Sequence, residues 1–132
     1  MVGVSRVTAV WLVTVCLAVS ATGQTATVGD TSRQFTEAVS AYRSGDVEGA
    51  LARFKRLAEV SPRDAEVRNW IGFLLMRQGK HAEAARSLEE AVRLKPDYVE
   101  AWTNLGNACL ASDARDRALQ AFRKAATLAP RN

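Results

Sequence analysis

The sequence predicts an all-α protein, an α-solenoid of three helix-turn-helix repeats built from antiparallel helix pairs. The first observation is that the only three prolines of the 132-residue chain stand 34 residues apart, at Pro62, Pro96 and Pro130. The second is that turn residues and apolar residues keep the same step, which indicates one supersecondary unit stacked several times. The repeating positions are Gly45, Gly79 and Asp113; Ala50, Ala84 and Ala118; Phe54, Leu88 and Phe122; Leu57, Ala91 and Ala125; and Val60, Leu94 and Leu128.

The first repeat, at about residues 31–64, follows a short polar leader at residues 24–30 that we expect to be flexible. Thr31 or Ser32 is expected to cap its first helix, with Gln34 completing a capping-box pattern. Gly45 ends this helix, because glycine adopts left-handed backbone angles without a steric cost. The apolar residues between them recur at i, i+3, i+4 and i+7, which is one helical face: Phe35, Ala38, Val39 and Tyr42.

The second helix of the first repeat is expected to be capped by Asp46 and ended by Pro62, since proline lacks an amide proton. The second and third repeats, at about 65–98 and 99–132, follow the same plan. Asp97 and Glu100 form another cap signature at the start of the third repeat.

Small residues predict where helices approach closely. Gly72 and Gly106, with Ala38 at the same position of the first repeat, are expected to bring the two helices of each unit together. A larger residue there would cost about 1–3 kcal/mol. The large side chains at a second repeating position are expected to fill the space between units: Phe54, Leu88 and Phe122.

Residues 1–23 have the layout of a secretory signal peptide. Arg6 precedes an uncharged apolar run from Val7 to Val19, and small residues follow it. Cleavage is expected after Ala21 or after Gly23. The apolar run is shorter than the ~20 residues that span a bilayer comfortably, but residues 7–23 kept in place as a membrane anchor remain the alternative. We therefore expect an exported protein, periplasmic or extracellular.

Charge and residue counts argue against several functions. A formal net charge of +4, with acids interleaved among the bases, is too mild for a nucleic-acid surface. Without the signal peptide, the one remaining cysteine, Cys109, is expected to be a small buried apolar residue. The single histidine, His81, is expected on a solvated loop, and with one cysteine it cannot build a usual metal site. We expect no catalytic residues and no cofactor.

The segment Ala101–Leu110 (AWTNLGNACL), with Ala118, Phe122, Ala125 and Pro130, closely resembles a tetratricopeptide repeat. The second repeat matches through Ile71, Gly72 and Ala84, although Arg68 stands at the tryptophan position, whereas the first matches only in its second helix. In the first helix of the first repeat, Glu37 occupies the usual leucine position, so this helix is either shifted or a polar cap. The resemblance covers about residues 31–132 and implies a right-handed superhelix that binds other proteins.

In proteins of this family the first helices of successive units line a concave groove, and the resemblance implies a peptide or protein partner there. Family members that bind peptide C-termini clamp the carboxylate with lysine and arginine, but the matching positions here hold Asn69, Asn104 and Glu100, with only Arg77 nearby, so a clamp is not supported. Trp70, Phe73 and Met76 instead suggest an apolar patch, unless they pack against the neighbouring unit. The groove candidates are Phe35, Val39, Tyr42, Asn69, Trp70, Phe73, Met76, Arg77, Thr103, Asn104, Asn107 and Leu110.

The last helix has no capping element after it in this sequence, whereas such arrays are usually closed by one. We expect Leu119 and Ala126 to be exposed there as a docking face for self-association or a partner. The predicted function is a non-catalytic, exported interaction module. The alternative is a membrane-tethered structural subunit that assembles through this last helix, with a membrane involved only if the N-terminal segment is retained.

Overall fold

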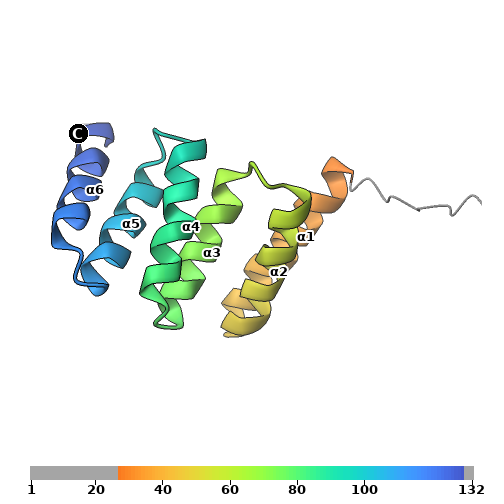
Figure 1. The fold of residues 1–132 in the computed structure, drawn as a ribbon. Coiled ribbons are helices and arrows are strands. Elements are labelled where there is room, and N and C mark those ends of the chain that lie inside the picture. The colour runs from red at the N-terminus through yellow and green to blue at the C-terminus, as the bar shows by residue number, and fades with distance from the viewer. Residues whose placement is uncertain (1–26, 130–132) are drawn as a thin grey trace, which may run out of the picture.

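The computed structural model describes residues 27–129, in which six helices follow one another in a row (Figure 1). The described part of the chain contains helices and turns only, so it is an all-α helical repeat solenoid. The predicted signal peptide at 1–23, most of the leader and Pro130 lie outside the described residues. The helices are α1 (Val28–Arg43), α2 (Val47–Val60), α3 (Ala65–Arg77), α4 (His81–Leu94), α5 (Val99–Ala111) and α6 (Arg115–Leu128).

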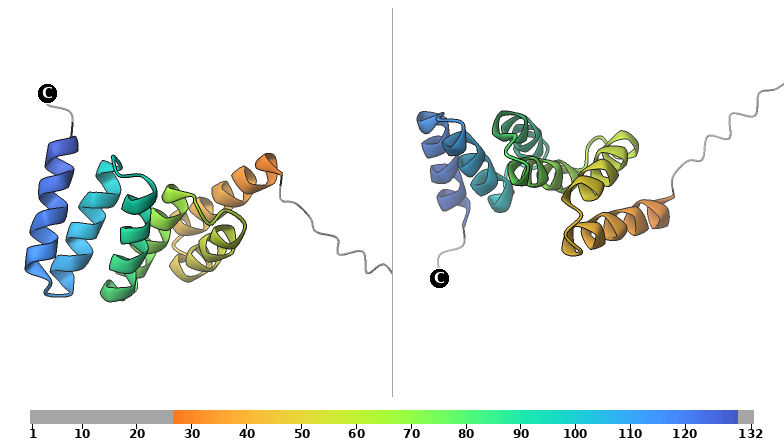
Figure 2. Two further views of the ribbon diagram at one scale, coloured as in Figure 1. Left: turned by 45° about the horizontal axis from the view of Figure 1, so that its top comes forward. Right: turned by 90° about the horizontal axis from the view of Figure 1, so that it is seen from below.

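Consecutive helices contact each other along the row, and α3 also contacts α5. The pairs α1–α2, α3–α4 and α5–α6 are the three predicted units. The first and last helices of the row run in clearly different directions, so the array twists along its length (Figure 2). No helix within residues 27–129 is long and apolar enough to cross a membrane.

The three turns inside the units share one geometry, as their repeat predicts. Gly45, Gly79 and Asp113 have φ of 90°, 75° and 59°, all in the left-handed region. At the first turn, the Gly45 amide donates to the Tyr42 carbonyl at 2.9 Å and the next amide donates to Ala41 at 3.0 Å. The other two turns repeat both hydrogen bonds. This is the Schellman pattern, which satisfies the last carbonyls of a helix.

The predictions for helix starts are partly confirmed. The Asp46 carboxylate accepts from the Gly49 amide at 2.7 Å and caps α2 as expected. Helix α1, however, begins at Val28, inside the predicted leader, and Thr31 is already helical, with its hydroxyl donating to the Val28 carbonyl. The predicted capping box at Thr31 or Ser32 is therefore wrong, because Gln34 donates its amide to Asp30 instead.

At the third repeat, too, the expected cap is absent. The residue before α5 is Tyr98, and it makes no side-chain capping hydrogen bond. Glu100 instead accepts a hydrogen bond from Asn69 of α3 at 3.2 Å. The Glu100 side chain therefore bonds to a residue of another unit and does not cap α5.

The predicted close approach within units is confirmed. A Cβ added to Gly72 would lie 2.4 Å from Cγ of Leu88, and one added to Gly106 would lie 2.6 Å from the Phe122 ring. Leu88 and Phe122 therefore pack against the glycine of their own unit. Phe54 also reaches the next unit, where its ring stacks on Trp70 at 5.2 Å.

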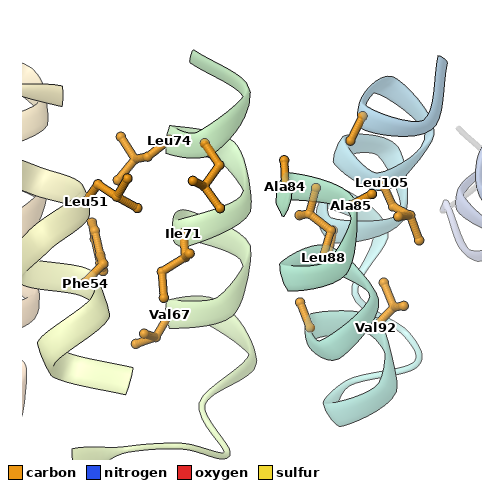
Figure 3. Packing of buried hydrophobic residues seen from close by; sticks show 14 of the residues in the cluster. Leu51, Phe54, Val67, Ile71, Leu74, Ala84, Ala85, Leu88, Val92 and Leu105 are labelled. Carbon is orange, nitrogen blue, oxygen red and sulfur yellow. The ribbon is translucent and has the colours of Figure 1, made fainter. Parts of the chain in front are cut away.

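The core between units is continuous. Leu51 and Phe54 of α2 point toward Val67, Ile71 and Leu74 of α3 (Figure 3). All five side chains are at most 5% exposed. Since a unit cannot bury this surface alone, each junction stabilises the units on both sides of it.

The first helix is in register with the other repeats and is not shifted. Ala38 is fully buried, in register with Gly72 and Gly106, so the repeat extends unbroken into α1. The Glu37 side chain is 60% exposed and approaches Arg33 at 4.0 Å. This exposure explains why a charged residue is tolerated at the usual leucine position.

Candidate interaction surface

Half of the predicted groove residues occupy two side-chain positions that repeat on α1, α3 and α5 and form one surface. We call it the odd-helix surface; its residues are Val39 and Tyr42, Phe73 and Met76, and Asn107 and Leu110. The first four are half-buried, whereas Asn107 is exposed and Leu110 is 56% exposed. Its third unit therefore offers the most accessible apolar side chain.

Aromatic contacts determine the shape of this surface between the first two units. Tyr42 meets Trp70 at 5.6 Å and Phe73 at 5.4 Å between ring centroids, both edge to face. Trp70 also stacks on the fully buried Phe54. Such pairs contribute about 0.5–1.5 kcal/mol each beyond their buried area. Trp70 and Phe73 thus hold the two units together and keep part of their surface accessible.

Phe35 belongs to the same aromatic group rather than to an open surface. Its ring lies 5.3 Å from that of Phe54, edge to face, and it is half-buried. Arg77 and Thr103 are exposed, as a contact residue must be. Arg77 stands in the last turn of α3, at the position that Arg43 holds in α1, so two cations flank the apolar positions on this side.

Asn69 does not lie on the surface, which corrects its place among the groove candidates. It is 2% exposed, and its amide nitrogen donates to the Tyr98 hydroxyl and to Glu100, both at 3.2 Å. Its carbonyl oxygen accepts from the Asn104 amide at 2.9 Å. A buried amide of this kind is expected to have its hydrogen bonds made within the protein. Asn104 is half-buried and uses one donor in this network, which joins the second unit to the third.

The same network shifts the pKa of Tyr98. Burial of the phenol, and secondarily the charge of Glu100, raises the pKa of Tyr98 to about 12, against the smaller lowering effect of the Asn69 hydrogen bond. Tyr98 is therefore a neutral hydrogen-bonding partner throughout the physiological range. Sequence reasoning missed it, because nothing in the repeat pattern marks this tyrosine.

Two hollows lie on the other side of the array, between successive even helices. One, of about 610 Å³, includes Lys55, Ile71 and Glu83 in its lining, and the second includes Glu89, Leu105 and Arg117. These residues are separated by one repeat, so the two hollows are equivalent. Their charges are exchanged, however: Lys55 and Glu83 correspond to Glu89 and Arg117, and the latter two form an ion pair. The predicted groove positions line neither hollow.

The residues that a catalytic function would need are unfavourably placed. Cys109 is 1% exposed, and burial raises the pKa of its thiol, so the reactive thiolate is suppressed. We expected His81 on a solvated loop, but it is half-buried at the start of α4. Residues 27–129 contain no group of three or more side chains that could hold a metal ion.

A family model described as "Tetratricopeptide repeat" matches residues 35–85 and 72–132. The chain belongs to the tetratricopeptide repeat family. Tetratricopeptide domains are protein-interaction modules, and the fold is generally non-catalytic. Over 84 residues the chain is 31% identical to "Protein CTR9 homolog" of Arabidopsis thaliana; the match covers 64% of this chain and 8% of that protein.

Solved tetratricopeptide structures share the fold. The first such domain of Spaghetti (RPAP3), bound to the HSP90 peptide SRMEEVD, has a TM-score of 0.77 and 18% identity, over 83% of this chain and 87% of that one. The Sgt2 domain from Aspergillus fumigatus has a TM-score of 0.74 and 20% identity, over 79% and 69% of the two chains.

Proposed function

We propose that this protein is a non-catalytic tetratricopeptide adaptor that binds a protein or peptide segment on the odd-helix surface. The observation that carries the proposal is Leu110, a large apolar side chain that is 56% exposed on α5. It continues the positions of Tyr42 and Met76 on the preceding odd helices. An exposed leucine in register with two half-buried apolar residues offers a partner an anchor.

The chemistry of the surface restricts the partner. Apolar contact would come from Leu110 and Met76, and the exposed amide of Asn107 can donate to and accept from a backbone. Arg43 and Arg77 at one edge favour acidic side chains in the ligand. A structure of similar fold holds an acidic peptide, SRMEEVD, which supports a peptide ligand as a class. The partner we propose is a short amphipathic segment with acidic residues on the side that faces the two arginines.

The test is site-specific crosslinking followed by a matched pair of substitutions. A photoreactive residue at position 110 should capture a partner in cells, and Leu110→Glu should weaken binding of that purified partner by at least tenfold. Leu119→Glu on α6 is the control, because Leu119 is similarly exposed at 48% but lies outside the odd-helix surface. Unchanged binding by the Leu110→Glu variant would refute the assignment.

We further propose that the protein is exported, on the basis of the signal-peptide layout of residues 1–23. Mass spectrometry of the protein from its native source should find an N-terminus at Thr22 or Gln24. A protein that keeps Met1 and sediments with membranes would favour the tethered subunit instead.

A further inference from the structure

The two equivalent hollows between the even helices differ in how far the chain itself fills them. The first hollow lies between α2 and α4 over α3, and its volume is about 610 Å³. The second lies between α4 and α6 over α5, and its volume is about 380 Å³. The first is thus well within the range of about 300–1,000 Å³ that is typical of small-molecule sites.

The residue at the base of each hollow is the first difference between them. Trp102 lines the second hollow, and its indole nitrogen donates to the Pro96 carbonyl at 2.8 Å. The equivalent residue of the first hollow is Arg68. An indole is wider than a guanidinium and apolar, so this exchange leaves more open space in the first hollow and puts a positive charge there.

An ion pair across the hollow is the second difference. In the second hollow, Glu89 of α4 pairs with Arg117 of α6. The equivalent residues of the first hollow are Lys55 of α2 and Glu83 of α4, and within residues 27–129 neither takes part in an ion pair. A ligand between α2 and α4 therefore has no such bridge to break.

Arg68 lacks an anionic partner in this hollow. Its Nε atom is buried and makes no hydrogen bond within the described part of the chain. Glu90 lines the same hollow, but its carboxylate accepts from Arg93 at 2.6 Å. Buried polar groups usually have a partner, and a carboxylate matches a guanidinium in charge and in planar geometry. Arg68 is half-buried, so a ligand in the hollow reaches its side chain.

The remaining charges of the lining also favour an anion. With Glu90 paired to Arg93, three cations remain against two acids. The cations are Lys55, Arg68 and Arg86, and the acids are Glu59 and Glu83.

The floor of the hollow indicates the rest of the ligand. Arg68, Ile71 and Leu75 are three and four residues apart and share one face of α3. Ile71 points from this face toward α2 (Figure 3), and Ile71 and Leu75 are both at most 5% exposed. A helix rises about 1.5 Å per residue, so the floor is about 10 Å long from Arg68 to Leu75. A carboxylate at Arg68 therefore leaves room for an apolar body of this length.

We propose that the hollow between α2 and α4 binds a small organic acid with an apolar body about 10 Å long. Arg68 pairs with the carboxylate, and Ile71 and Leu75 contact the body. The ligand touches helices of the first two units, so its binding stabilises their junction. This site does not depend on the odd-helix surface, whose residues line neither hollow.

The test is an NMR titration of the isotope-labelled chain with 4-phenylbutyrate, whose ring and chain together approach the length of the floor. Two matched probes separate its parts: 4-phenylbutanamide keeps the body without the charge, and acetate keeps the charge without the body. Phenylbutyrate should cause saturable shifts at amides of the hollow and bind at least fivefold more tightly than either probe.

Two substitutions at one position test the role of Arg68. Arg68→Gln removes the charge and should lower the affinity for phenylbutyrate to that for the amide. Arg68→Trp introduces the residue that the third repeat holds at this position, so it should fold, fill the hollow and abolish the saturable shifts. Circular dichroism checks that both variants are folded.

The control substitutions lie outside the hollow. Arg56→Gln removes a cation from the exposed side of α2, and Leu110→Glu alters the odd-helix surface; each should change the affinity less than twofold. Shifts that do not saturate, equal binding of phenylbutyrate and its amide, or unchanged binding by the Arg68→Gln variant would each overturn the proposal.

Discussion

Replacing Asn69 with aspartate tests the buried network that joins the second and third units. The substitution keeps the size of the side chain but exchanges its amide for a carboxylate. Asn69 is 2% exposed and its amide nitrogen lies 3.2 Å from a carboxylate oxygen of Glu100. An ionised carboxylate in place of this amide would therefore put two acids side by side, one of them away from water.

The expected cost follows from charge and burial. Two like charges about 4 Å apart interact by about 4 kcal/mol at an effective dielectric constant of 20. Glu100 is exposed, which reduces this repulsion, while lost donors to Tyr98 and Glu100 add to the cost. We expect Asn69→Asp to lower the free energy of unfolding by about 3 kcal/mol at pH 7.

The sign of the pH dependence is specific. Burial and Glu100 should raise the pKa of the new carboxyl above its value in the unfolded chain. Its neutral form, which resembles the native amide, is favoured in the folded state below the unfolded pKa of about 3.9. The destabilisation relative to wild type should thus be small near pH 3.5 and grow as the pH rises through the folded pKa.

Urea unfolding of wild type and variant at a series of pH values measures this difference. Asn69→Ala is the control, because it removes the same hydrogen bonds without adding a titrating group. Its cost of about 1–3 kcal/mol should be nearly the same at each pH. A pH-independent cost for Asn69→Asp would refute the contact between this site and Glu100.

Three further substitutions test the packing, the turns and the tyrosine. Gly72→Ala should lower stability by about 1–2 kcal/mol in thermal or urea melts, despite the better helix propensity of alanine, because its Cβ would meet Leu88. Gly29→Ala is the control and should not lower stability, because nothing lies within 4 Å of a Cβ at that position. Equal effects of the two substitutions would contradict the close approach at Gly72. Asp113→Gly should raise stability by about 0.5–1 kcal/mol by relieving a φ of 59°, so a loss would argue against the strained turn. Because the pKa of Tyr98 is raised to about 12 in the folded state, the stability that it contributes is complete below pH 10 and lost as the pH rises through 12. Unfolding free energies between pH 10 and 12 should therefore fall more steeply for wild type than for Tyr98→Phe, and parallel curves would contradict this.

Most of the fold could be predicted from the sequence because its determinants recur every 34 residues. Gly45, Gly79 and Asp113 mark turns through their own backbone preferences, and they adopt the predicted left-handed angles. Gly72 and Gly106 mark close approach through the lack of a side chain.

Local patterns failed where a side chain had two competing partners. Glu100 matched a capping signature but accepts from Asn69, and Gln34 matched another but donates to Asp30. The first competitor lies 31 residues away, on a different unit, so no window of one helix could reveal it.

The sequence by itself determined the 34-residue period, the turns and the close approach of the helices at Gly72 and Gly106, because each depends on residues within one unit. Only the tertiary structure decided that Asn69 is buried, that Trp70 stacks on Phe54 between units, and that the equivalent hollows exchange their charges. These features arise where side chains of neighbouring units meet at the same height along their helices. That height depends on how the units pack against each other, and the spacing of residues along one helix does not determine this packing.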